Sequence, residues 1–85
     1  MQVIICFDST THAIMAEQCL CINGLSVGVM PLPTSIRAGC GICLRLSFAD
    51  ITPALDLLRE DKIPFAGVWQ SVSGTNKVTY LYLDI

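Results

Sequence analysis

The fold is set by residues 3–11, which read Val-Ile-Ile-Cys-Phe-Asp-Ser-Thr-Thr. The β-branched and aromatic residues from Val3 to Phe7 are typical of a buried strand. Asp8 ends this run, and the hydroxyl residues after it can accept hydrogen bonds from the free amides at a helix start. The stretch therefore predicts a strand that leads directly into a helix.

The rest of the chain extends this pattern. Small and apolar residues at helical spacing predict a helix over 11–22, with a left-handed stop at Asn23-Gly24. A second helix is predicted with Thr52 as its N-cap and Pro53 as its first residue, ending before Pro64. Further strands are predicted over 25–30, 42–48, 65–72 and 78–83.

This order predicts an α+β fold of the ferredoxin-like βαββαβ type, with an extra C-terminal strand. Two helices should cover one face of an antiparallel sheet in which the first four strands stand in the order 4-1-3-2. In strand 42–48, the even-numbered apolar residues should face one side and Cys43, Arg45 and Ser47 the other.

Composition narrows the classes of partner. The chain has 85 residues, enough for a single domain, and 53% are hydrophobic while only 14% are charged. Such a surface predicts a homodimer or a higher homo-oligomer. The net charge of −2, with no basic run, argues against nucleic acid and against a membrane surface as partners. The N-terminus lacks the basic region of a signal peptide, so we expect a cytoplasmic protein.

Cys40 is the strongest candidate for chemistry. In the expected topology, the loop before strand 42–48 lies where the first strand ends and the first helix begins, which brings Cys40 near His12. Gly39 and Gly41 flank the cysteine, and we expect them to leave its sulfur open to another molecule. The helix start and Arg37, in the same loop, would favour the thiolate, and His12 could accept a proton.

The five cysteines allow other uses. Cys40 and Cys43 have Cys-x-x-Cys spacing, but three residues of strand span roughly 10 Å, beyond the ~7 Å between Cα atoms that a disulfide allows. A zinc site lacks a second pair of ligands, since His12, Cys19 and Cys21 share one helix. Cys6 is expected to be a small buried hydrophobic residue, as is Cys19. We expect neither a metal nor an organic cofactor.

Several segments in the same order resemble the selenium/sulfur carrier protein-like family. They are Phe7-Asp-Ser-Thr-Thr-His-Ala13, Ala16-Glu17, Pro31-Leu-Pro33 and Cys40-Gly-Ile-Cys-Leu-Arg45, and the resemblance covers about residues 3–70.

The resemblance implies that Cys40, followed by Gly41, is the functional cysteine. It further implies that the protein holds a persulfide or a selanylsulfide there and passes it between donor and acceptor proteins, with Arg37 or Arg45 helping to hold the anion. Thr34 stands where the family commonly has a basic residue, and Cys43 where a small residue without a thiol is usual. Residues 71–85 fall outside the resemblance and are expected to form a hairpin for dimerisation.

Two alternatives to the carrier stay open. One is a non-catalytic ferredoxin-like module that binds a ligand or assembles with a partner. The other is a thiol redox protein that uses Cys40 with Cys43. As an enzyme, the protein would be at most sulfurtransferase-like, with a cysteine thiolate as its nucleophile.

Overall fold

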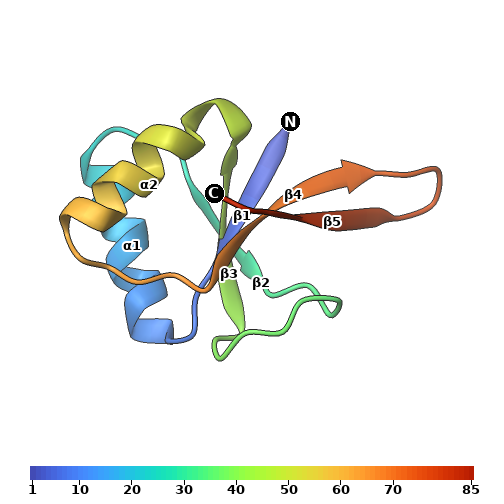
Figure 1. Cartoon of the computed structure of the whole chain (residues 1–85), viewed down its shortest axis with the longest axis horizontal. Helices are drawn as coiled ribbons and strands as arrows, with labels where there is room; N and C mark the ends of the chain where they lie inside the picture. The colour runs from blue at the N-terminus through green and yellow to red at the C-terminus, as the bar shows by residue number, and fades with distance from the viewer.

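A computed structural model describes all 85 residues. Its elements are, in chain order, β1 (Gln2–Cys6), α1 (Thr10–Ile22), β2 (Gly28–Pro31), β3 (Ile42–Ser47), the short 3-10 turn η1 (Phe48–Asp50), α2 (Ile51–Glu60), β4 (Gly67–Ser73) and β5 (Val78–Leu83). The fold is α+β, as expected. The five strands form one sheet in the order β2-β3-β1-β4-β5, and every neighbouring pair is antiparallel. Read from β4, the first four strands stand in the predicted order 4-1-3-2, and β5 extends the sheet beside β4 (Figure 1).

Both helices pack on the same face of the sheet (Figure 1). The main apolar cluster joins Val3 and Ile5 of β1 and Leu44 and Leu46 of β3 to side chains from both helices, among them Ala13, Ala16, Leu20, Leu55 and Leu58. The alanines of α1 lack bulk, so the helix can lie close to the sheet. The predicted alternation along β3 is confirmed, because Leu44 and Leu46 face the helices while Cys43 belongs to a separate cluster.

No helix residue joins the smaller cluster on the opposite face of the sheet. Its buried members are Ile4, Cys6, Ile36 and Cys43. Ile36 comes from the β2–β3 loop (residues 32–41), and Leu32 and Ala38 of the same loop pack against the cluster. The loop therefore covers part of the sheet that the helices leave free.

The second strand begins later than predicted. It starts at Gly28 rather than Leu25, because the Leu25 amide donates to Leu20 O at 3.0 Å and closes the end of α1. Gly24 has a φ of +84°, which confirms the left-handed stop after the helix.

The start of the second helix was also predicted wrongly. Thr52 is not the N-cap, because α2 begins at Ile51 and follows directly on η1. The chain turns early since Ser47 Oγ accepts a hydrogen bond from Ala49 N at 3.3 Å. Pro53 still lies in the first turn of α2, where its missing N–H costs no intrahelical bond.

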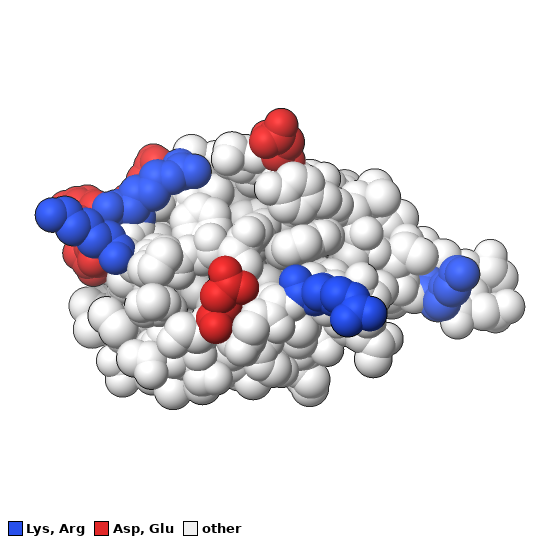
Figure 2. All heavy atoms as spheres, turned by 60° about the horizontal axis from the view of Figure 1, so that its bottom comes forward, with Lys and Arg blue, Asp and Glu red and all other residues white.

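The β4–β5 hairpin projects from the rest of the molecule (Figure 1). Its exposed large apolar side chains include Val78, Leu81 and Tyr82. On the face shown in Figure 2, charged side chains gather at the helical end and are sparse elsewhere. None of the helices combines the length and the hydropathy needed to span a bilayer.

Replacing Leu44 tests the packing between sheet and helices. Leu44 is 0% exposed, so Leu44→Ala should lower the free energy of unfolding by about 2–5 kcal/mol, through lost transfer energy and a residual cavity. The control Val29→Ala, at a side chain that is 55% exposed on β2, should change it by less than about 0.5 kcal/mol. Urea unfolding followed by circular dichroism measures both, and equal effects would contradict the assigned core.

Candidate functional site

The sulfur of Cys40 lies at the N-terminus of α1. Cys40 Sγ is 3.3 Å from Thr10 Oγ1, and Thr10 is the first residue of that helix. Next to it, Gly39 N donates to Asp8 Oδ1 at 3.2 Å. These contacts confirm that the β2–β3 loop meets the junction between β1 and α1, as the topology predicts.

The end of α1 beside Cys40 is not capped by a side chain. Ser9 occupies the N-cap position without a side-chain hydrogen bond to the helix, and the first backbone bond of the helix runs from Ala13 N to Ser9 O at 3.1 Å. The amides of the first turn carry the positive end of the helix dipole. Cys40 thus has a hydroxyl within hydrogen-bond distance and a partial positive charge close by.

The prediction that the Cys40 sulfur is accessible to another molecule is wrong, because the side chain is buried. Cys40 is only 3% exposed and belongs to the apolar cluster between sheet and helices. The cause is Gly39, whose missing Cβ would stand 2.5 Å from Asp8 O. Without a side chain, the loop approaches the Asp8 backbone closely, and the next residue is turned inward.

The other predicted site residues are spread around Cys40 rather than gathered on it. Arg37 is exposed in the β2–β3 loop, and Gly41 is exposed, with open space where a Cβ would stand. His12 is half-buried on the first turn of α1. It lines a hollow with Asp8 and Phe65, and Cys40 is not part of that hollow. None of these residues makes a hydrogen bond to the Cys40 side chain.

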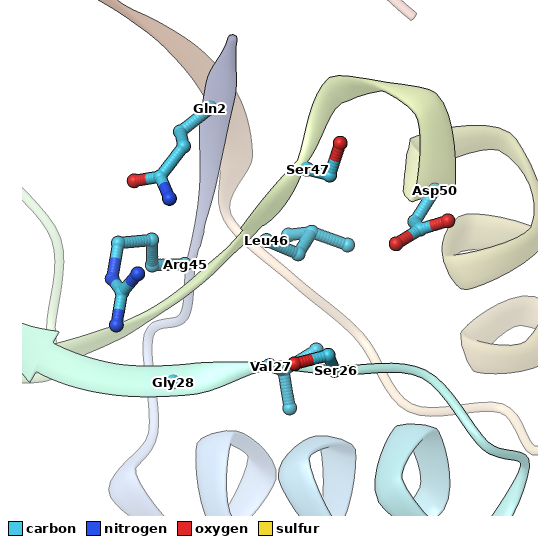
Figure 3. A pocket seen from close by; sticks show the side chains of 8 residues that line it. All are labelled: Gln2, Ser26, Val27, Gly28, Arg45, Leu46, Ser47 and Asp50. Carbon is cyan, nitrogen blue, oxygen red and sulfur yellow. The ribbon is translucent and has the colours of Figure 1, made fainter.

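Arg45 lies in a different hollow, on the far part of β3 (Figure 3). Its guanidinium extends over Gly28, where an added Cβ would collide with it, and Gln2 lies on its other side. From Ile42 to Arg45 the strand advances by roughly 10 Å. Arg45 and Cys40 therefore do not form one cluster.

The remaining cysteines occupy three kinds of environment. Cys19 is buried, as expected, and its Sγ donates to Asp61 Oδ2 at 3.1 Å. Cys21 is exposed, and its S–H donates to Glu17 Oε2 at 3.3 Å. Hydrogen bonding to Glu17 is the largest cause that raises the pKa of Cys21. No group of three or more His, Cys, Asp or Glu side chains is arranged to hold a metal ion.

Sequence reasoning missed that Cys6 and Cys43 face each other. They are paired residues of the antiparallel ladder between β1 and β3, and both are buried. Their positions within two predicted neighbouring strands were the available signal, but the register was needed to align them.

The fold and the site define a small α+β protein with one thiol held at a helix N-terminus. A family model described as "Putative Se/S carrier protein-like" matches residues 2–70, and the chain belongs to that family. Neither the curated proteins nor the solved structures contain a match to this chain.

The two glycines beside Cys40 provide a matched test of how the loop is held. Gly39→Ala should force the loop away from Asp8 O, lowering the free energy of unfolding by about 1–3 kcal/mol and speeding alkylation of Cys40. Gly41→Ala meets nothing within 4 Å and should change stability by less than about 0.5 kcal/mol. Iodoacetamide labelling with peptide mass spectrometry gives the alkylation rate. Identical rates in both variants would show that Gly39 does not hold Cys40 inward.

Cys19 predicts a stability change at alkaline pH. Burial, followed by the hydrogen bond to Asp61, raises the pKa of the Cys19 thiol from 9.0 to about 11. Because the folded state holds this proton more tightly than the unfolded chain, the stabilisation is complete below about pH 9 and is lost as the pH rises through about 11. The free energy of unfolding should therefore fall over this range more steeply in the parent protein than in Cys19→Ala. Urea titrations across the range measure both slopes, and parallel curves would refute the assignment.

Proposed function

We propose that this protein carries a sulfur or selenium atom covalently on Cys40 and passes it between partner proteins. The observation that carries the proposal is the contact of Cys40 Sγ with Thr10 Oγ1 at the uncapped start of α1. A terminal chalcogen held there would be an anion at neutral pH, and helix N-termini bind anions well. Membership of the carrier-like family supports the same reading. Arg37, exposed in the same loop, is proposed to meet the charged group when the loop moves.

The transfer is a thiol exchange. The Cys40 thiolate attacks the terminal sulfur of a donor persulfide, R–S–SH, and the donor S–S bond breaks. The donor thiolate leaves with the bonding electrons and takes up a proton, so Cys40 now holds Cys–S–SH. A nucleophile of the acceptor then attacks the same terminal sulfur and releases the Cys40 thiolate. Selenium follows the same steps as Cys–S–SeH, and no metal or organic cofactor takes part.

Exchange requires the β2–β3 loop to open, because Cys40 is buried when the loop is closed. Opening must break the packing of Cys40 in the apolar cluster and two hydrogen bonds near the end of the loop. Gly39 N donates to Asp8 Oδ1, and the base of the loop is closed by a hydrogen bond of 2.9 Å from Leu32 N to Gly41 O. Docking of a donor or an acceptor on the exposed loop would supply the contacts that replace these bonds. The closed loop would then protect the loaded sulfur between partners.

The proposed scaffold is a ferredoxin-like domain whose C-terminal strand serves self-association. β5 has an unpaired edge, and residues 78–83 contain neither a charge nor a proline. Edges of this kind pair readily with another strand. We infer a homo-oligomer built through β5, which leaves the end of the sheet with Cys40 free for partner proteins.

The carrier function can be tested with a persulfide donor. The Cys21→Ser variant removes the exposed thiol, which would otherwise react without specificity. Incubation of this protein with a cysteine desulfurase and cysteine should add one sulfur, ~32 Da, and the peptide that contains Cys40 should carry it. Cys21→Ser/Cys40→Ala should gain no mass, and Cys21→Ser/Thr10→Val should load more slowly because Thr10 Oγ1 is lost. Intact-protein and peptide mass spectrometry measure all three.

The experiment also separates the carrier from a binding module. The double variant Cys21→Ser/Cys19→Ala removes a buried thiol away from the site and should load normally. If no donor modifies Cys40 in folded protein, or if the adduct forms on Cys43 instead, the carrier proposal fails. A binding module would keep its function in Cys40→Ser.

A further inference from the structure

Cys6 and Cys43 are placed as a cross-strand pair. Cys6 is the last residue of β1 and Cys43 the second residue of β3, and they stand directly opposite each other in the antiparallel register. Residues in such positions have Cβ atoms ~4.5–5.5 Å apart, whereas a disulfide needs about 3.5–4.5 Å. Because Cβ positions are set by the backbone, the two strands would have to draw together slightly before the two sulfurs could join.

The surroundings of the pair differ from those of Cys40. Both residues are 0% exposed and lie in the small apolar cluster with Ile4 and Ile36, on the face without helices. Cys43 Sγ is 3.8 Å from Pro31 O, which can accept its S–H. Cys40 belongs to the other cluster, on the helix side. Cys40 and the pair therefore belong to different clusters, although Cys40 lies near enough to help raise the pKa of Cys6 through charge repulsion.

The thiols of Cys6 and Cys43 differ in acidity. Hydrogen bonding with Cys43 and burial raise the pKa of Cys6 far above its ordinary value. Hydrogen bonding from Cys6 lowers the pKa of Cys43, and this effect outweighs its burial. Because the thiolate is the nucleophile, Cys43 is the sulfur of the pair that should react first.

We propose that Cys6 and Cys43 form a second thiol site, which a small hydroperoxide oxidises reversibly to a cross-strand disulfide. The proposal does not depend on Cys40 or on the carrier function. It replaces the expectation that Cys6 is inert and that Cys43, if it pairs at all, pairs with Cys40.

Hydrogen peroxide serves as the model oxidant, and the reaction has two steps. The Cys43 thiolate attacks one peroxide oxygen, the O–O bond breaks, and the leaving hydroxide takes a proton to become water, so that Cys43 becomes a sulfenic acid. The sulfur of Cys6 then attacks Cys43 Sγ, the S–O bond breaks, and hydroxide leaves with the Cys6 proton as a second water. Two sulfurs lose one electron each, and the peroxide gains both. A dithiol reductant reverses the reaction.

The bond would act on the segments that hold Cys40. Asp8, which binds Gly39, comes two residues after Cys6, and Cys40 comes three residues before Cys43. A disulfide would fasten the end of β1 to the start of β3 and restrain the chain on both sides of the β2–β3 loop. Oxidation should therefore slow the opening that exposes Cys40.

The test uses variants that keep both cysteines, so the protein folds as usual. Folded Cys21→Ser/Cys40→Ala is treated with hydrogen peroxide, and its intact mass should fall by ~2 Da and recover with dithiothreitol. Trypsin cuts after Arg37 and Arg45, and the peptide 38–45 should then be linked to 1–37 through Cys6. In Cys21→Ser, where Cys40 is present, its alkylation rate should fall several-fold after oxidation.

Controls distinguish this pair from others. Cys19→Ala in the same background should leave the link intact, whereas Cys43→Ala should abolish it while circular dichroism shows a folded protein. The proposal is overturned if the link joins Cys43 to Cys19, or if folded protein accumulates sulfinic acid at Cys43 without any link. A protein that forms the link but fails to load Cys40 with sulfur would refute the carrier function alone.

Discussion

The whole structure depends on β1 being buried on both faces. Residues 3–7 are all at most 1% exposed, with one set of side chains turned to the helices and the other to the free face of the sheet. A strand covered in this way needs partners on each edge, and β3 and β4 supply them. The end of β1 is thereby fixed in the middle of the molecule. From there the chain delivers Cys6, Asp8 and Thr10 to one region within five residues.

Local signals were enough to predict most elements. β5 was predicted at residues 78–83 and is observed there, because its tyrosine and leucine content and the turn residues just before it are local signals. The start of β2 could not be read in the same way, since the Leu25 amide is used by the end of α1. Likewise, Thr52 has the chemistry of a cap, but the preceding 3-10 turn had already begun the helix. The errors arose where neighbouring elements share residues.

The position of the candidate site was predicted correctly, but the burial of the Cys40 sulfur was not. Topology alone places the β2–β3 loop near the start of α1, and this holds for Cys40 and Thr10. Burial of the sulfur depends on how closely Gly39 approaches Asp8 O, and no periodic pattern encodes that approach. The Cys6–Cys43 pair depends on register, since a slip of one residue turns Cys43 to the other face. The Cys-x-x-Cys spacing offered Cys40 as a partner for Cys43 only at a separation too long for a disulfide, whereas the register places Cys6 opposite Cys43.

The exposed thiol, Cys21, is poorly suited to act as a nucleophile, whereas the buried thiol, Cys40, has the more suitable surroundings. Cys21 is the exposed cysteine, yet its S–H is held by Glu17, which raises its pKa and disfavours the nucleophilic thiolate. Cys40 is buried, yet it has a hydroxyl contact and the positive end of a helix. A sulfur atom bound at an exposed position would be lost to any passing thiol. In the proposed carrier, a thiol that reacts only when the β2–β3 loop opens could instead select its partners, so the burial of Cys40 would protect a labile group rather than prevent its transfer.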